Sequence, residues 1–189
     1  MKYSGILLLL MAYSAISPAQ TKENSTPKKW SYAYLDSIIQ SHKGVAYVPF
    51  NVTSLDGKRF TNELCKGKVT FISLWFESCG GCRAEFPEIN KLYDSIKQNP
   101  NYQFIAITYD AKETLPEFIK ANKMNFPVAT VSDYDLFGKL RYGMGCPGII
   151  ILDPNGRIGF IGMYAVTDND NGGLTISIGK ILDTMKELL

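Results

Sequence analysis

The sequence predicts an α/β domain whose mixed central β-sheet is flanked by helices on both faces. Two apolar runs, Val69–Phe76 and Phe104–Thr108, are typical of strands buried on both faces. The intervening segment, Cys82–Lys97, carries apolar residues at the spacing of an amphipathic helix. Further along, Gly148–Leu152 and Arg157–Ile161 flank an Asp-Pro-Asn-Gly turn and predict an antiparallel hairpin. A strand–helix–strand unit followed by a hairpin therefore predicts a sheet of mixed direction.

Shorter elements are expected before the first central strand. Trp30–Ile39 is compatible with a short helix and also with a strand. Val48–Val52 is typical of an extended edge segment, because Pro49 cannot donate a hydrogen bond to a neighbouring strand. An Asp-Gly pair at positions 56 and 57 is a hairpin turn signal, and Lys58–Thr61 supplies the returning strand.

Four further elements complete the predicted domain. Thr114–Lys123 is expected to be helical, with Pro116 in its first turn, where proline is tolerated. Phe126–Val131 is predicted to be extended and Tyr134–Tyr142 helical. The apolar pattern of Leu174–Leu189 predicts one amphipathic helix that closes the chain.

The N-terminal residues have the pattern of an export signal. Lys2 precedes the apolar run Ile6–Ile16, and small residues follow up to Ala19. A retained membrane anchor is the alternative, although the run is shorter than the roughly 20 residues that span a bilayer. We therefore expect a signal peptide over residues 1–19, an N-terminal extension over 20–44 and one domain over 45–189, with a periplasmic or otherwise exported location.

Charge and cysteine content narrow the function classes. The formal net charge is only +2, and the basic residues form no cluster, so nucleic acid is not an expected partner. All four cysteines follow the predicted signal peptide. Export would place them in an oxidising compartment, where disulfides persist.

Cys79 and Cys82 form a CxxC motif between a predicted strand and a predicted helix. Backbone N–H groups and the dipole at a helix start stabilise a thiolate, so this placement indicates disulfide chemistry with an exposed, nucleophilic Cys79. The alternatives are half of a zinc site and a structural disulfide. Zinc usually takes four ligands, but His42 is the only histidine and Cys65 and Cys146 are isolated. A two-residue loop constrains the unfolded chain too little to make a useful structural link.

The sequence resembles the thioredoxin-like superfamily in its central strand, in Trp75, in the CxxC pair and in Pro147 just before the hairpin. The lead-in hairpin, the Glu85–Pro87 run and the additional strand and helix within Asn101–Tyr142 resemble the TlpA/ResA-type exported thiol–disulfide oxidoreductases. This resemblance covers Val45–Leu189. It implies a thioredoxin-like fold with an N-terminal β-hairpin extension.

The resemblance also implies roles for individual residues. Cys79 would attack a substrate disulfide, Cys82 would resolve the mixed disulfide, and Glu85, if buried, would assist proton transfer. Many cytoplasmic relatives carry an acid on the preceding strand, where this sequence has Ser73. Glu77 is closer to the pair in sequence but is expected to point to solvent.

Three residues are expected to form the substrate-binding side of the pair: Trp75, Cys146 and Pro147. Pro147 matches the position of the cis-proline of the family, and Cys146 stands where threonine or valine is common. Cys146 is either a small packing residue or a third thiol that competes for Cys79. Cys65 lies at the far end of the strand, so no second disulfide is expected.

The expected function is disulfide exchange with proteins, in the reducing direction and without a cofactor or bound metal. The implied partners are protein disulfides or dithiols and an upstream membrane-linked electron donor, with cytochrome maturation as a family association. Two other classes stay open. One is a peroxiredoxin-like peroxide reductase, which usually has proline and threonine shortly before its reactive cysteine, unlike Ser73–Ser78. The other is a non-catalytic binding module.

Overall fold

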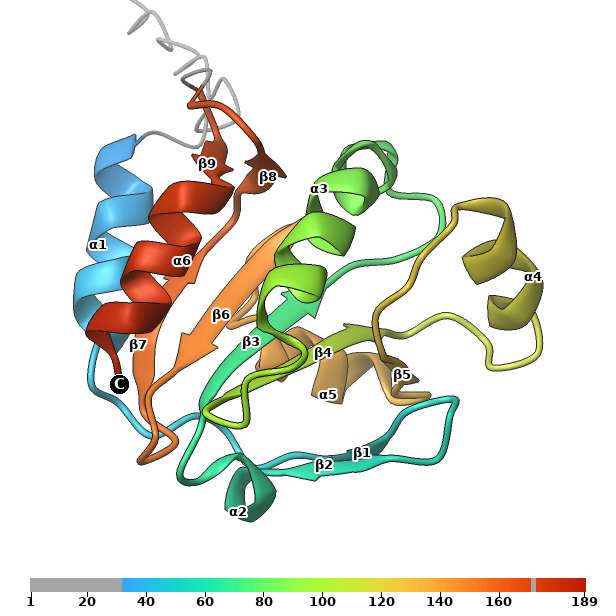
Figure 1. Ribbon diagram of the computed structural model, residues 1–189, viewed down its shortest axis with the longest axis horizontal. Helices are drawn as coiled ribbons and strands as arrows, with labels where there is room; N and C mark the ends of the chain where they lie inside the picture. The colour runs from blue at the N-terminus through green and yellow to red at the C-terminus, as the bar shows by residue number, and fades with distance from the viewer. Residues whose placement is uncertain (1–31, 171–172) are drawn as a thin grey trace, which may run out of the picture. The chain divides into compact units, whose positions relative to one another are not determined.

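The computed structural model describes residues 32–170 and 173–189 (Figure 1). The predicted signal peptide, residues 1–19, lies outside the described residues, as does Trp30. Side chains are described from Asp36 onward. Among these residues, no helix is both long enough and apolar enough to cross a membrane.

A central five-stranded sheet organises the domain, with strand order β5-β4-β3-β6-β7. Its strands are β3 (Val69–Leu74), β4 (Tyr102–Thr108), β5 (Val128–Thr130), β6 (Gly148–Leu152) and β7 (Ile158–Gly162). In the middle of β3, Phe71 pairs with Phe104 of parallel β4 and with Ile151 of antiparallel β6. The predicted mixed sheet, with β6 and β7 as an antiparallel hairpin, is therefore confirmed.

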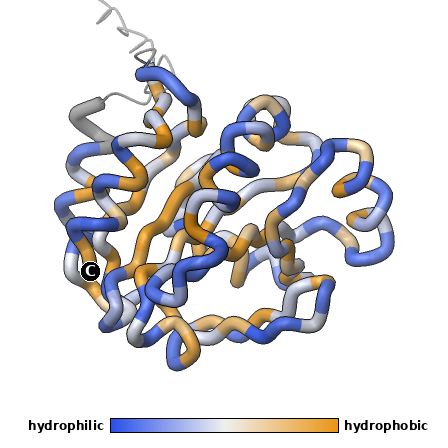
Figure 2. The backbone as a smooth tube through the Cα atoms, in the orientation of Figure 1, coloured by the Kyte–Doolittle hydropathy of each residue, from blue (hydrophilic) through white to orange (hydrophobic). Residues whose placement is uncertain are grey.

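Alternate residues of β3 enter two different hydrophobic clusters, one on each face of the sheet. Val69 and Phe71 belong to the cluster that includes the buried apolar residues of α3 (Gly80–Ile96) and α6 (Ile178–Glu187). Ile72 and Leu74 belong to the cluster that includes α5 (Tyr134–Leu140) and the N-terminal hairpin. Hydrophobic segments accordingly follow the central strands in Figure 2. Burial on both faces explains why apolar residues occupy both sides of this strand rather than alternate positions only.

The remaining helices are α1 (Tyr32–His42), α2 (Asn62–Cys65) and α4 (Leu115–Ala121). The sequence of Trp30–Ile39 was compatible with either a helix or a strand, and its described part is helical. Ile38 and Ile39 of α1 pack against the same cluster as α5, and Leu115 at the start of α4 lies in the cluster of α3. Helices therefore cover both faces of the sheet, as predicted (Figure 1).

The predicted N-terminal hairpin is confirmed as β1 (Asn51–Thr53) paired antiparallel with β2 (Arg59–Thr61). Its turn contains Gly57, whose φ of 88° lies in the left-handed region that favours glycine. Phe60 of β2 is fully buried and anchors the hairpin to the core.

The C-terminal segment differs from its prediction as one helix. Thr175–Ser177 is a short strand, β9, which pairs in parallel with β8 (Ala165–Thr167). The helix α6 starts only at Ile178, because the Ser177 hydroxyl accepts a hydrogen bond from the Lys180 N–H at 3.2 Å and caps it. The sequence predicted a helix here because Ile176, which is buried in the strand, also fits the helical spacing of the apolar residues that follow it.

Candidate functional site

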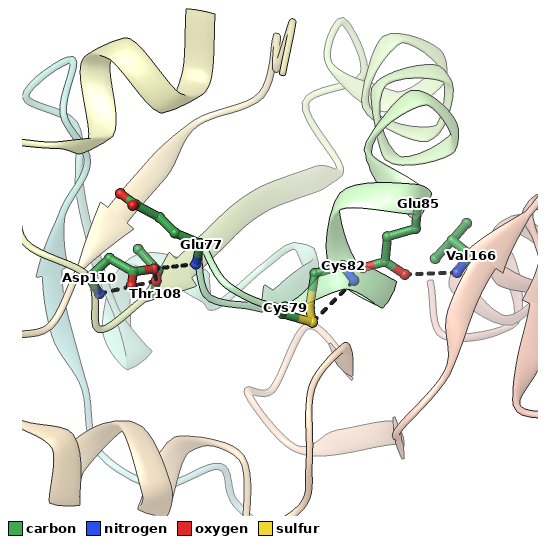
Figure 3. The surroundings of a disulfide bond; sticks show 7 residues. All are labelled: Glu77, Cys79, Cys82, Glu85, Thr108, Asp110 and Val166. Carbon is green, nitrogen blue, oxygen red and sulfur yellow. Dashed lines mark hydrogen bonds between the residues drawn. A yellow bond between two sulfur atoms is a disulfide. The ribbon is translucent and has the colours of Figure 1, made fainter. Parts of the chain in front are cut away.

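The junction between β3 and α3 carries the CxxC pair (Figure 3). Cys79 is the N-cap residue of α3, and its Sγ accepts a hydrogen bond from the Cys82 N–H at 3.1 Å. The two cysteines form the predicted disulfide, with their Cα atoms 5.3 Å apart. A sulfur in the N-cap position accepts from backbone N–H groups that have no partner within the helix, and it lies at the positive end of the helix dipole. This is the environment that stabilises a thiolate at Cys79 after reduction.

Cys79 is less accessible than predicted. Its exposed fraction is 7%, and Cys82 is fully buried. In the disulfide form, the Cys79 side chain belongs to the same hydrophobic cluster as Cys82, Trp75 and Phe86. The expectation of an exposed Cys79 considered only its place at a helix start, and it is wrong for the disulfide form because the residue packs within this apolar cluster.

Glu85 is buried, which is the condition on which its predicted role in proton transfer depends. It lies in the second turn of α3 and is only 2% exposed. Its Oε2 accepts a hydrogen bond from the Val166 N–H of β8 at 2.9 Å (Figure 3). Burial raises the pKa of its carboxyl to about 8, and the hydrogen bond from Val166 opposes this rise. Near neutral pH such a group can both take and return a proton.

Cys146 and Pro147 lie beside the first turn of α3. The peptide bond between them is cis, which confirms the prediction for Pro147. A Cβ placed on Gly81 would lie 3.5 Å from the Pro147 Cδ, so the proline ring packs against the loop of the CxxC motif. Cys146 is a free, half-buried thiol, and burial raises its pKa to about 11. Cys65 is also free and fully buried.

Trp75 lies beneath the pair rather than at its surface. It is fully buried, and its ring stacks on Phe118 at a centroid distance of 5.5 Å and meets Phe86 edge-on at 5.3 Å. The expectation that Trp75 contacts substrate is therefore corrected, because neighbouring aromatic rings leave it no accessible surface. Phe76 is half-buried and packs against the same cluster.

The remaining acidic and polar candidates take other positions. Ser73, which occupies the place of the strand acid of many relatives, is buried in β3. The Glu77 side chain is half-buried and accepts a hydrogen bond from the Thr114 hydroxyl at 2.6 Å. Figure 3 shows that it points away from the disulfide. Among the described residues, no three histidine, cysteine, aspartate or glutamate side chains gather as a metal site.

Sequence reasoning missed Asp110. Its carboxylate accepts a hydrogen bond from the backbone N–H of Glu77, in the loop that leads to Cys79 (Figure 3). The signal that would have revealed it is the position of Asp110 just after the second buried strand. The carboxyl ends of the parallel strands β3 and β4 meet at one edge of the sheet, where active-site residues of open α/β sheets gather. The Val166 N–H had no signal in the sequence, because any residue except proline supplies this donor.

Comparison with known proteins identifies the family. The AhpC/TSA family matches residues 44–161, which is more than half of the chain. The chain belongs to the AhpC/TSA family. Among its relatives, the thiol-disulfide oxidoreductase ResA of Bacillus thuringiensis (strain Al Hakam) is 33% identical over 113 residues, and ResA of Bacillus cereus is 31% identical over 110 residues. Each match includes 58% of this chain and 62% of the relative, so the chain spans less than two thirds of their length.

Solved structures show the fold of this AhpC/TSA-family chain. StoA from Bacillus subtilis superposes with a TM-score of 0.58 at 19% identity, over 72% of this chain and 96% of StoA. The thioredoxin domain of a thiol-disulfide oxidoreductase from Bacteroides vulgatus gives a TM-score of 0.56 at 24% identity, over 63% of this chain and 86% of that domain. The predicted thioredoxin-like fold is confirmed.

Proposed function

We propose that the protein is a thiol–disulfide oxidoreductase that reduces protein disulfides through Cys79 and Cys82. The observation that carries this proposal is the Cys79 sulfur at the N-cap of α3, where it accepts the Cys82 N–H and is bonded to the Cys82 sulfur. The names of the ResA relatives support the same chemistry.

The reaction begins with the reduced pair. The Cys79 thiolate attacks one sulfur of a substrate disulfide, and the substrate S–S bond breaks as a mixed disulfide forms. The other substrate sulfur leaves in this first step as a thiolate and is protonated. Cys82 then loses its proton and attacks the Cys79 sulfur, and the substrate sulfur that was bonded to Cys79 leaves as the second thiolate and is protonated. Two electrons thus pass from the CxxC pair to the substrate. The enzyme ends in the disulfide state, and a thiol donor linked to the membrane restores the dithiol.

Glu85 is proposed as the proton acceptor for Cys82. Cys82 is fully buried, so its thiol needs a base within the protein when it attacks. Glu85 follows Cys82 by three residues on α3, which places the two side chains on one side of the helix (Figure 3). A carboxyl whose pKa is about 8 holds a proton nearly as well as a thiol does, and transfer between the two costs little free energy.

An extracytoplasmic location is part of the proposal. It rests on the export-signal pattern of residues 1–19. Cleavage after Ala19 is the corresponding event. N-terminal sequencing of the protein purified from an exporting host would test it, and a protein that retains residues 1–19 would contradict the proposed cleavage.

A mixed-disulfide trap tests the central proposal. Cys82→Ser should accumulate covalent complexes with protein substrates, because the resolving thiol is absent, and reducing agents should release them. The double variant Cys79→Ser/Cys82→Ser is the matched control and should capture nothing. Equal capture by the double variant would refute the assignment of Cys79 as the nucleophile.

The direction and the substrate class need separate measurements. A reduction potential of about −120 mV for the Cys79–Cys82 couple, as in strong oxidants, would overturn the reducing direction. Stopped-flow oxidation of the reduced protein should be faster with a protein disulfide than with hydrogen peroxide at equal concentration. Faster oxidation by peroxide would favour the peroxide-reductase alternative instead.

A further inference from the structure

The loop between β3 and α3 is attached to the neighbouring strand at a defined point. The Trp75 N–H donates to the Ile107 carbonyl at 3.1 Å and extends the β3–β4 pairing beyond the end of β3. Two residues later, the Glu77 N–H donates to Asp110 Oδ2 at 2.7 Å. The next contact along the loop is a turn, in which the Cys79 N–H donates to the Phe76 carbonyl at 3.0 Å. Asp110 therefore holds the loop where it leaves the sheet and approaches Cys79.

Asp110 is itself held from several directions. The hydroxyl of Thr108, which is fully buried, donates to the same Oδ2 atom, and the Asp110 N–H donates to the Thr108 hydroxyl at 3.2 Å. The Thr130 hydroxyl of β5 donates to the Asp110 carbonyl at 2.6 Å. The carboxylate thus links the end of β4 to the cysteine loop, while its backbone is tied to β5. Such a network fixes the carboxylate before the loop contacts it.

We propose that Asp110 is a positioning residue for Cys79, acting through its hydrogen bond to the Glu77 N–H. The inference rests on the proposed function, because it assigns a residue that serves the reactivity of the same pair. The Cys79 sulfur is stabilised only while it stays at the N-cap of α3, close to the Cys82 N–H. A loop held two residues before the N-cap keeps the sulfur in that place in the reduced protein.

The charge of Asp110 cannot explain this role. A carboxylate near a thiolate disfavours the thiolate, so charge alone would make Cys79 less reactive. Any gain in Cys79 reactivity must therefore come from the position of the loop, and the effects of charge and of loop position can be measured separately. Both hydrogen bonds go to one oxygen, Oδ2, so the amide oxygen of an asparagine can replace it without the negative charge.

Three variants in a Cys82→Ser background test the proposal. Asp110→Asn keeps the acceptor and removes the charge, Asp110→Ala removes both, and Thr114→Val is the matched control. Thr114 donates to the Glu77 side chain rather than anchoring its backbone, so its loss leaves the Asp110 bond intact. Iodoacetamide alkylation of Cys79 in the reduced protein is followed against pH by mass spectrometry of the Cys79 peptide, and thermal unfolding checks the fold of each variant.

The expected results distinguish positioning from charge. Asp110→Asn should alkylate at least as fast as the parent at about pH 7, whereas Asp110→Ala should be about tenfold slower than Asp110→Asn with its profile shifted to higher pH. Thr114→Val should stay within about twofold of the parent. Identical profiles for the Asn and Ala variants, or an equal loss in Thr114→Val, would overturn the proposal.

A second variant keeps the test decisive if Asp110→Ala does not fold. Thr108→Val removes the hydroxyl that orients Oδ2 and should give a loss in the same direction but smaller than that of Asp110→Ala. Parent-like reactivity of folded Thr108→Val, in the absence of a folded Asp110→Ala, would overturn the proposal. Alkylation needs no protein substrate, so failure of the trap experiment and failure of this inference give different results.

Discussion

Replacing Glu85 with glutamine should make the oxidised protein more stable at alkaline pH and leave its stability nearly unchanged in acid. Glu85 is only 2% exposed, and burial disfavours its ionised form. Glutamine has nearly the same shape and does not titrate. It also presents a carbonyl oxygen to the Val166 N–H, which Glu85 Oε2 accepts at 2.9 Å. The substitution therefore removes a charge without removing the hydrogen-bond acceptor.

The magnitude follows from the pKa of Glu85, which burial raises from 4.5 to about 8. Below pH 4.5 the carboxyl is protonated in both the folded and unfolded states, so its ionisation costs the fold nothing. Between pH 4.5 and about 8 the unfolded state ionises while the folded state keeps its proton, and the wild type loses stability as pH rises. At about 1.36 kcal/mol per pKa unit, the full loss above pH 8 is roughly 5 kcal/mol.

Urea unfolding of the oxidised protein between about pH 4 and pH 9 measures this effect. Structural relaxation and water entry reduce the full electrostatic cost, so we expect Glu85→Gln to gain about 3 kcal/mol relative to wild type across this range. Glu117→Gln is the matched control, since Glu117 is exposed on α4, and its difference from wild type should not change by more than about 0.5 kcal/mol.

A stability difference that stays constant from acid to alkali would refute the reasoning. So would a glutamine variant that loses stability relative to wild type as pH rises. Either result would mean that the carboxyl is hydrated in solution or that it keeps an ordinary pKa. The proposed proton transfer from Cys82 would then lose its physical basis.

Three other outcomes follow from the structure. Burial raises the pKa of the Cys146 thiol to about 11. At about pH 8 this thiol should therefore react with iodoacetamide at least tenfold more slowly in the folded oxidised protein than in urea, as measured on the Cys146 peptide. Equal rates would contradict its burial. Gly57→Ala should lower the free energy of unfolding by about 1 kcal/mol, because its φ of 88° strains any other residue, and an unchanged urea midpoint would argue against this turn. Phe71→Ala should cost about 3–5 kcal/mol by the same measurement, with the exposed Leu64→Ala as control, and a cost below about 1 kcal/mol would contradict the packing of β3.

Most elements could be predicted from sequence because their signals are local. The runs that became β3 and β4 are mostly apolar on both faces, and the turn of the N-terminal hairpin needs a glycine with positive φ at Gly57. The CxxC spacing brings Cys79 and Cys82 within one helical turn, which is close enough for the observed disulfide. The cis peptide bond at Pro147 and the proposed role of Glu85 were predicted instead from the family resemblance, since local spacing indicates neither.

The predictions failed where short segments or distant contacts decide the structure. Thr175–Ser177 forms β9 only because β8 lies beside it, and an isolated three-residue segment carries no reliable periodicity. The burial of Cys79 depends on apolar side chains contributed by the strand before it and the helix after it, and Trp75 is enclosed by rings from α3 and α4. Accessibility is a property of the assembled core, which residue type and position in an element do not specify.

The sequence by itself determined the order of the elements that form the central sheet and the placement of the CxxC pair at the start of a helix, because backbone propensity and hydrophobic periodicity act over a few residues. Only the tertiary structure decided the environment of that pair. The Val166 N–H reaches Glu85 across 81 residues of sequence, and Asp110 reaches the Glu77 N–H across 33. Desolvation and hydrogen bonding depend on which groups the fold brings together, and these contacts decide how the two sulfurs and the Glu85 carboxyl are held.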